Sequence, residues 1–171
     1  MLVTNHVLSG AVIGVATRRP LPAFLLGVAS HFVLDSLPHW GKLEDDHFFR
    51  VAVADGLTGL AAMGLVTRAV LTGGKAAGNG SGRGHGGGQG TTASRGRLAV
   101  AVLAGMAGAA LPDLDKPSEL LLGHQLWPDA VNRFHRDIQN EAPHRFVSHE
   151  LVAAAGFALT AAALIRRRVA R

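Results

Sequence analysis

The chain has 171 residues, of which 48% are hydrophobic and 17% charged, with no cysteine and a formal net charge of +5. This composition is more apolar and less charged than that of an ordinary soluble domain, so we expect lipid to be the solvent for much of the chain. The absence of cysteine excludes disulfides, thiolate zinc sites and cysteine nucleophiles, and leaves histidine and carboxylates as the available metal ligands.

Apolar stretches recur along the sequence, and their content of Ala, Leu, Val and Gly predicts helices rather than strands. The stretches are residues 5–17, 21–37, 50–72, 97–112 and 148–165. A spanning helix needs about 20 residues, so the third stretch is long enough, whereas the first and fourth are short. The start of the chain lacks the basic segment of a signal peptide, and we expect the first stretch to be retained. Small residues dominate residues 10–14 and 101–110, which predicts close helix packing.

Two polar segments separate the later stretches. Residues 73–96 are rich in glycine and predict a disordered linker. Residues 113–148 carry both charge signs, and within them residues 132–141 predict a short amphipathic helix. The sequence therefore predicts an all-α membrane bundle of four to five helices with a polar outer cap. Its parts are N-terminal membrane helices in residues 1–72, the linker, and C-terminal membrane helices in residues 97–171.

Charge predicts the orientation of this bundle. If successive helices alternate in direction, one side receives basic residues only, and the other receives all twelve acidic residues. The basic side consists of Arg18, Arg19, Arg68, Lys75, Arg83, Arg95, Arg97, Arg166, Arg167, Arg168 and Arg171. By the positive-inside rule we expect a multi-pass protein of the cell membrane with its linker and C-terminus in the cytoplasm. Because the basic residues flank apolar segments, they indicate contact with membrane lipid and no nucleic-acid partner, and no feature identifies a protein partner.

Histidines and carboxylates gather on the predicted outer side. His31 and Asp35 are four residues apart, which puts both on one face of a helix inside an apolar stretch. Ionisable residues in membrane helices are costly and are functional candidates, and Asp55 also meets this condition. The alternative is that these residues only hydrogen-bond neighbouring helices.

Two further motifs lie at the same side. Asp113 and Asp115 precede Pro117, and paired carboxylates on a stiff turn suit a divalent cation, although Asp and Pro are also ordinary turn residues. His144 and His149 are five residues apart and share a helix face only if a helix boundary lies between them.

These motifs resemble those of the YdjM-like family of predicted membrane-bound metal-dependent hydrolases. The resemblance rests on an N-terminal His, a Leu-Pro-Asp-x-Asp turn, a His-Arg-x-x-Ser-His element and a Ser-His-x-x-x-Asp helix. The order of the motifs differs, since the Ser-His-x-x-x-Asp helix comes last in the family and precedes the turn here. Lys116 stands where the family often has a histidine. By position, the resemblance implies metal-site roles for His6, Asp113, Asp115, His144, Arg145, His149, His31 and Asp35.

The leading hypothesis is a hydrolase that uses a divalent metal, zinc foremost with magnesium and manganese as alternatives, on a phosphoester or lipid-linked substrate at the outer face. We expect Asp35 and Asp113 to be catalytic, and Arg145 and His39 to bind substrate. The expected ligands are His6, His31, Asp35, Asp55, Asp113, Asp115, His144 and His149. Two other classes stay open: a metal-free scaffold or interaction protein, and a proton relay through His31, Asp35 and Asp55.

Overall fold

The computed structural model describes residues 1–41, 45–73, 88–142 and 144–169, and over these ranges the chain is all-helical. The described elements are α1 (Val3–Thr17), α2 (Pro20–Ser36), α3 (Asp45–Thr72), α4 (Gly88–Ala110), the 3-10 turn η1 (Leu111–Leu114), α5 (Asp115–Leu122), α6 (Asp129–Ile138) and α7 (Val147–Val169). The all-α bundle predicted from the sequence is confirmed. The amphipathic helix predicted at residues 132–141 corresponds to α6, which begins three residues earlier.

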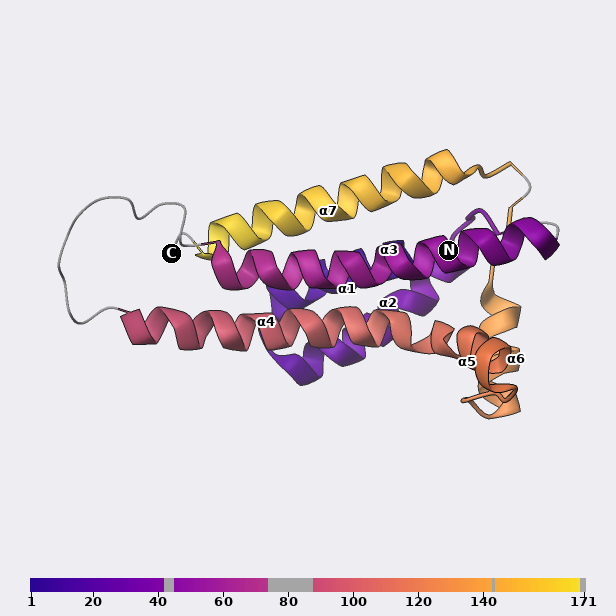
Figure 1. Ribbon diagram of the computed structural model, residues 1–171, viewed down its shortest axis with the longest axis horizontal. Coiled ribbons are helices and arrows are strands. Elements are labelled where there is room, and N and C mark those ends of the chain that lie inside the picture. The colour runs from indigo at the N-terminus through magenta and orange to yellow at the C-terminus, as the bar shows by residue number, and fades with distance from the viewer. Residues whose placement is uncertain (42–44, 74–87, 143, 170–171) are drawn as a thin grey trace.

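The five long helices alternate in direction. In Figure 1, α1, α3 and α7 run one way, and α2 and α4 return. Helix α4 packs against both α1 and α2, and α1 also contacts α3 and α7, so α1 lies at the centre. We call the end that carries η1, α5 and α6 the cap end. We call the opposite end, where α1 meets α2, α4 begins and α7 finishes, the arginine end.

Glycines allow α1, α2 and α4 to approach closely. A Cβ atom added at Gly10 would overlap the carbonyl oxygen of Gly105, and one added at Gly27 would overlap the same oxygen. One turn further along α4, a Cβ at Gly108 would overlap the carbonyl of Phe24. Small residues at such crossings let helix backbones approach closely. The van der Waals contacts formed in this way help to hold helices together in lipid. The close packing predicted for residues 10–14 and 101–110 is therefore present.

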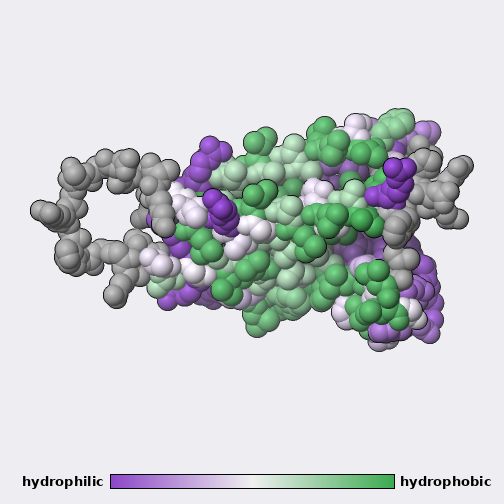
Figure 2. Space-filling view, in the orientation of Figure 1, coloured by the Kyte–Doolittle hydropathy of each residue, from purple (hydrophilic) through white to green (hydrophobic). Residues whose placement is uncertain are grey.

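Three helical segments are long and apolar enough to cross a membrane, namely Arg50–Thr72, Thr92–Glu119 and Val147–Arg168. Two of them expose large apolar side chains, with Leu65 68% and Val152 74% exposed, which water would penalise and lipid would not. Figure 2 shows an apolar surface over the middle of the bundle and polar residues gathered at its two ends. Helices α1 and α2 are apolar but have only 15 and 17 residues.

The fourth apolar stretch is longer than the sequence predicted. Helix α4 begins at Gly88, so residues 88–96, which we assigned to the disordered linker, are helical. The reason is that extending an existing helix costs little once its first turn has formed, even through residues of modest propensity. With this extension the stretch is no longer short for a membrane span. The remainder of the predicted linker, residues 74–87, lies outside the described residues.

Candidate metal centre

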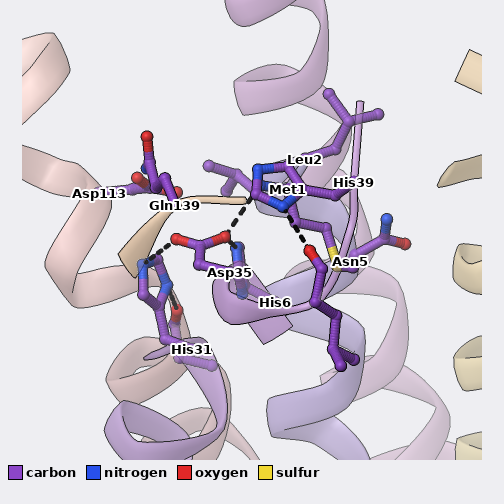
Figure 3. Close-up of polar contacts among 12 residues, drawn as sticks. Met1, Leu2, Asn5, His6, His31, Asp35, His39, Asp113 and Gln139 are labelled. Carbon is purple, nitrogen blue, oxygen red and sulfur yellow. Dashed lines mark hydrogen bonds and ion pairs between the residues drawn. The ribbon is translucent and has the colours of Figure 1, made fainter. Parts of the chain in front are cut away.

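Asp35 occupies the centre of a buried polar cluster at the cap end of the bundle. It lies in the last turn of α2, is fully buried, and points toward α1 and α6. Oδ1 is 3.1 Å from Nε2 of His6 and 2.8 Å from the amino group of Met1. Oδ2 is 3.1 Å from Nε2 of His31 and 3.0 Å from Nε2 of His135. Figure 3 shows this carboxylate between His6 and His31, so segments distant in sequence meet at one side chain.

The backbone of α4 fixes the orientation and the tautomer of His31. Its Nδ1 donates to the carbonyl oxygen of Ala109 at 2.8 Å, at the C-terminal end of α4, where carbonyls have no partner within the helix. A carbonyl can only accept, so Nδ1 carries the proton, and in the neutral ring Nε2 presents a lone pair. That Nε2 atom lies 2.9 Å from Nε2 of His135. A metal-ligating histidine is commonly held by such a bond from its other nitrogen.

His135 is a site residue that the sequence analysis did not identify. It lies on α6, whose buried side chains include Asn132 and His135, three residues apart and therefore on one face. Asn132 donates to the carbonyl of Trp127 and to Oε1 of Gln125, which ties α6 to the loop before it. Phe32 of α2 packs edge-on against both His135 and Phe134. The sequence signal for His135 was a pair of polar residues, Asn132 and His135, on one face of an amphipathic helix. Whether this pair belongs to a site depends on where α6 packs in the folded chain.

Asp113 completes a group of four potential ligands. It lies on η1, directly after α4, and its Oδ1 is 3.9 Å from Nε2 of His135. This buried oxygen forms an ion pair with Nζ of Lys116 at 2.9 Å. One ligand atom from each of His31, Asp35, Asp113 and His135 lies within 4.8 Å of all the others. This buried group could hold a metal ion.

The spacing of the donor atoms suits a small ion. In tetrahedral zinc, ligand distances of about 2.0 Å put neighbouring ligand atoms about 3.3 Å apart. The atoms of His31, His135 and Asp35 are separated by 2.9, 3.0 and 3.1 Å, close to one face of such a tetrahedron. Asp113 stands slightly farther off. The group therefore offers three converging donors and a fourth position that Asp113 or a water molecule can fill.

His6 lies beside this group. Its ring stacks on that of His31 with centroids 4.0 Å apart, and its Nε2 donates to Oδ1 of Asp35. With Nε2 engaged in this way, Nδ1 of His6 is buried and has no hydrogen-bond partner. The structure thus places His6 as a neighbour that orients Asp35, outside the four-residue group.

Two of the expected carboxylate ligands bind backbone instead. Asp55 of α3 accepts hydrogen bonds from the amides of Val3 and Thr4 and from the Thr4 hydroxyl, so it caps the N-terminus of α1 from a neighbouring helix. Asp115 accepts from the amides of Leu126 and Trp127 and thereby holds the loop between α5 and α6. In each case the carboxylate satisfies backbone donors that would otherwise lack partners.

The remaining expected site residues lie outside the four-residue group. His39 is buried, its Nδ1 is 2.9 Å from the carbonyl of Leu37, and its backbone pairs with Asn140 and Ala142. His149 is exposed at the start of α7, and its Nδ1 accepts from the amide of Phe146. His144 and Arg145 are exposed in the segment that leads into α7. Of the eight ligands expected from the sequence, the structure therefore gathers His31, Asp35 and Asp113, and adds His135.

Comparison with known proteins does not relate this chain to a protein family. No protein-family model matches the sequence, and no characterised protein or solved structure matches the chain.

Proposed function

We propose that the chain is a multi-pass membrane metalloprotein in which His31, Asp35, Asp113 and His135 bind one divalent cation. The observation that carries this proposal is the convergence of one potential ligand atom from each of these four buried side chains to within 4.8 Å of the others. Oδ2 of Asp35 lies 3.1 Å from Nε2 of His31, whose Nδ1 donates to Ala109, and 3.0 Å from Nε2 of His135. A divalent cation bound between these atoms would relieve the repulsion between the lone pairs of the two ring nitrogens and the carboxylate oxygen.

The donor set favours zinc. Two imidazole nitrogens with carboxylate oxygens match sites known for zinc, whereas magnesium prefers oxygen ligands in octahedral geometry. Manganese accepts mixed nitrogen and oxygen ligands and is the alternative. The supporting features are burial of all four side chains and the bond from His31 to Ala109, which prepares Nε2 as a ligand.

We further propose that the site hydrolyses a phosphoester or a lipid-linked substrate. Zinc bound there would polarise water and a phosphoryl oxygen. If water fills the fourth position in place of Asp113, Asp113 would be the neighbouring carboxylate that accepts its proton, with Lys116 paired to its Oδ1 at 2.9 Å. The resemblance of the motifs to the YdjM-like family supports the same reaction class.

The charge distribution supports an orientation for the site. The segments that meet at the arginine end contribute Arg18, Arg19, Arg97 and Arg168, whereas Asp35 and Asp113 lie toward the cap end. We propose that the arginine end faces the cytoplasm and that the cap end, with the metal centre, faces outside. A substrate that is part of a membrane lipid would then reach the centre from the outer leaflet.

Metal analysis of detergent-purified protein tests this proposal. We compare the wild type with Asp113→Asn and His135→Gln after dialysis against a weak chelator. The matched controls are Asp137→Asn, an exposed carboxylate on α6, and His149→Gln, an exposed histidine. We expect zinc in the wild type and controls and its loss from the two site variants. Equal zinc in all five proteins, or none in the wild type after growth with added zinc, would refute a site at these residues.

A metal-free scaffold is the second candidate, and a specific observation favours it. Buried carboxylates elsewhere in the bundle act as structural ties: Glu150 of α7 accepts from the amides of Leu2 and Trp40 and from Nδ2 of Asn5. Asp35 has several potential donors around it as well. If that is its role, chelators leave the melting temperature unchanged. If the metal proposal holds, chelation lowers it, because a ligand bound only to the folded state stabilises that state.

A further inference from the structure

A second polar site lies at the arginine end, on the opposite side of the bundle from the metal centre. An open pocket of about 400 Å³ lies there, and its polar lining residues are Thr17, Arg18, Arg19, Ser94, Arg97 and Arg168. These residues come from the turn between α1 and α2, the first part of α4 and the last turn of α7. Three separate parts of the chain thus contribute arginines to one place.

Among the residues that the structure describes, no side-chain carboxylate pairs with the four arginines of this pocket. The sequence has no Asp or Glu in residues 1–34, 56–112 or 151–171, and the described segments at this end lie within these ranges. Within the described ranges, none of the ion pairs involves an arginine. Like charges held together without counter-charges repel one another, so the pocket favours an anion from outside the chain.

The backbone conformation of Arg18 is also unusual. Arg18 has φ 57°, the left-handed conformation that glycine adopts most easily at the end of a helix. Arginine at this position is less favourable for the backbone than glycine, yet it adds a guanidinium to the pocket.

Apolar surface begins directly beside the arginines. Leu21 and Leu25 of α2 are 67% and 57% exposed, and Val100 of α4 is 53% exposed, all within two turns of a pocket arginine. A ligand that joins an anionic group to hydrocarbon chains would satisfy both surfaces at once. Basic pockets between membrane helices bind lipid phosphates in this way.

We propose that the pocket formed by Arg18, Arg19, Arg97 and Arg168 binds the phosphate headgroup of an anionic phospholipid. Arginine suits this role because its planar fork pairs with two phosphate oxygens, and Ser94 places a hydroxyl group beside it. The acyl chains would lie along the exposed leucines of α2. This inference does not depend on a metal at the cap end.

Binding of defined lipids to the full-length protein in detergent tests the proposal, with native mass spectrometry as the readout. The probes are phosphatidylglycerol, which is anionic, and phosphatidylcholine, which is zwitterionic. We expect the wild type to retain phosphatidylglycerol selectively. The double variant Arg97→Gln, Arg168→Gln should bind it about tenfold more weakly or worse. The matched control is Arg68→Gln, Arg166→Gln, which removes the same charge outside the pocket lining and should bind close to the wild-type value.

Three outcomes would overturn the proposal. Equal retention of the two lipids removes the anion preference, and equal weakening by both double variants shows diffuse attraction without a pocket. Displacement of phosphatidylglycerol by inorganic phosphate at comparable concentration shows a site for the free ion. Helicity measured by circular dichroism shows whether each variant is folded. A further control is Arg18→Gly, which removes one pocket charge and places glycine at a left-handed backbone position that glycine favours. This variant should melt no lower than the wild type and still bind phosphatidylglycerol more weakly.

Discussion

The Nε2 atoms of His31 and His135 lie 2.9 Å apart, although 104 residues separate them in the chain. The contact joins α2, in the apolar bundle, to α6, in the polar cap. Asp35 contacts both atoms through one oxygen. The position of α6 therefore decides whether the cluster is complete.

Acid should release the metal. Histidine ligates only when deprotonated, so protons compete with the cation at both His31 and His135. Apparent zinc affinity should fall by about tenfold per pH unit for each histidine that must lose a proton. A fluorescent zinc indicator titrated against the protein at several pH values measures this slope. In the control His149→Gln the slope should match that of the wild type, and an affinity independent of pH would contradict histidine ligation.

Replacement of His6 should weaken the site without abolishing it. His6→Phe keeps a ring stacked on His31 and removes the hydrogen bond to Asp35. Loss of such an orienting bond typically costs about 10- to 100-fold in metal affinity. Competition with a chelator of known affinity gives the value. A complete loss of metal, equal to that of His135→Gln, would instead indicate that His6 is itself a ligand, as the sequence suggested.

Removal of the Asp55 cap should lower stability and leave metal binding intact. Asp55→Ala deprives the amides of Val3 and Thr4 of their acceptor. Loss of a helix N-cap costs about 0.5–2 kcal/mol. Thermal unfolding in detergent followed by circular dichroism measures the change, and zinc content is determined on the same sample. Loss of zinc from a folded Asp55→Ala protein would restore Asp55 to the ligand set.

Bulk at the glycine crossing should disrupt the bundle. A leucine at Gly105 would enter the space held by the backbone of Gly10, whereas Gly156 of α7 has open space around its Cβ position. Overpacking of this kind costs about 1–3 kcal/mol. We expect Gly105→Leu to melt lower than the wild type and Gly156→Leu to melt no lower. Similar melting of the two variants would contradict the close approach of α1 and α4.

The absence of cysteine makes the orientation directly measurable. Ser94→Cys places a thiol at the arginine end, and Ser148→Cys places one where α7 begins, near the cap end. A maleimide that does not cross membranes should label only Ser148→Cys on intact cells and both variants after lysis. Labelling of Ser94→Cys alone on intact cells would reverse the proposed orientation. That outcome would not contradict the proposed metal centre.

The sequence alone determined the helices and one part of the centre. Long apolar runs without polar alternation can satisfy their backbone groups in lipid only as helices, so the bundle was predictable. The four-residue spacing of His31 and Asp35 placed them on one face of α2 before any packing was known. The start of α4 was missed because helix extension into residues 88–96 leaves no mark in composition.

Only the tertiary structure decided which carboxylates bind backbone and which face the centre. Asp55 and Asp113 look alike in sequence, since each is an acidic residue near the end of an apolar stretch. Packing puts Asp55 against the free amides of α1, and it leaves Asp113 beside His135 and Lys116. The role of a buried carboxylate depends on the hydrogen-bond donors that folding brings to it. Those donors come from segments far away in the sequence, so spacing along the chain does not predict them.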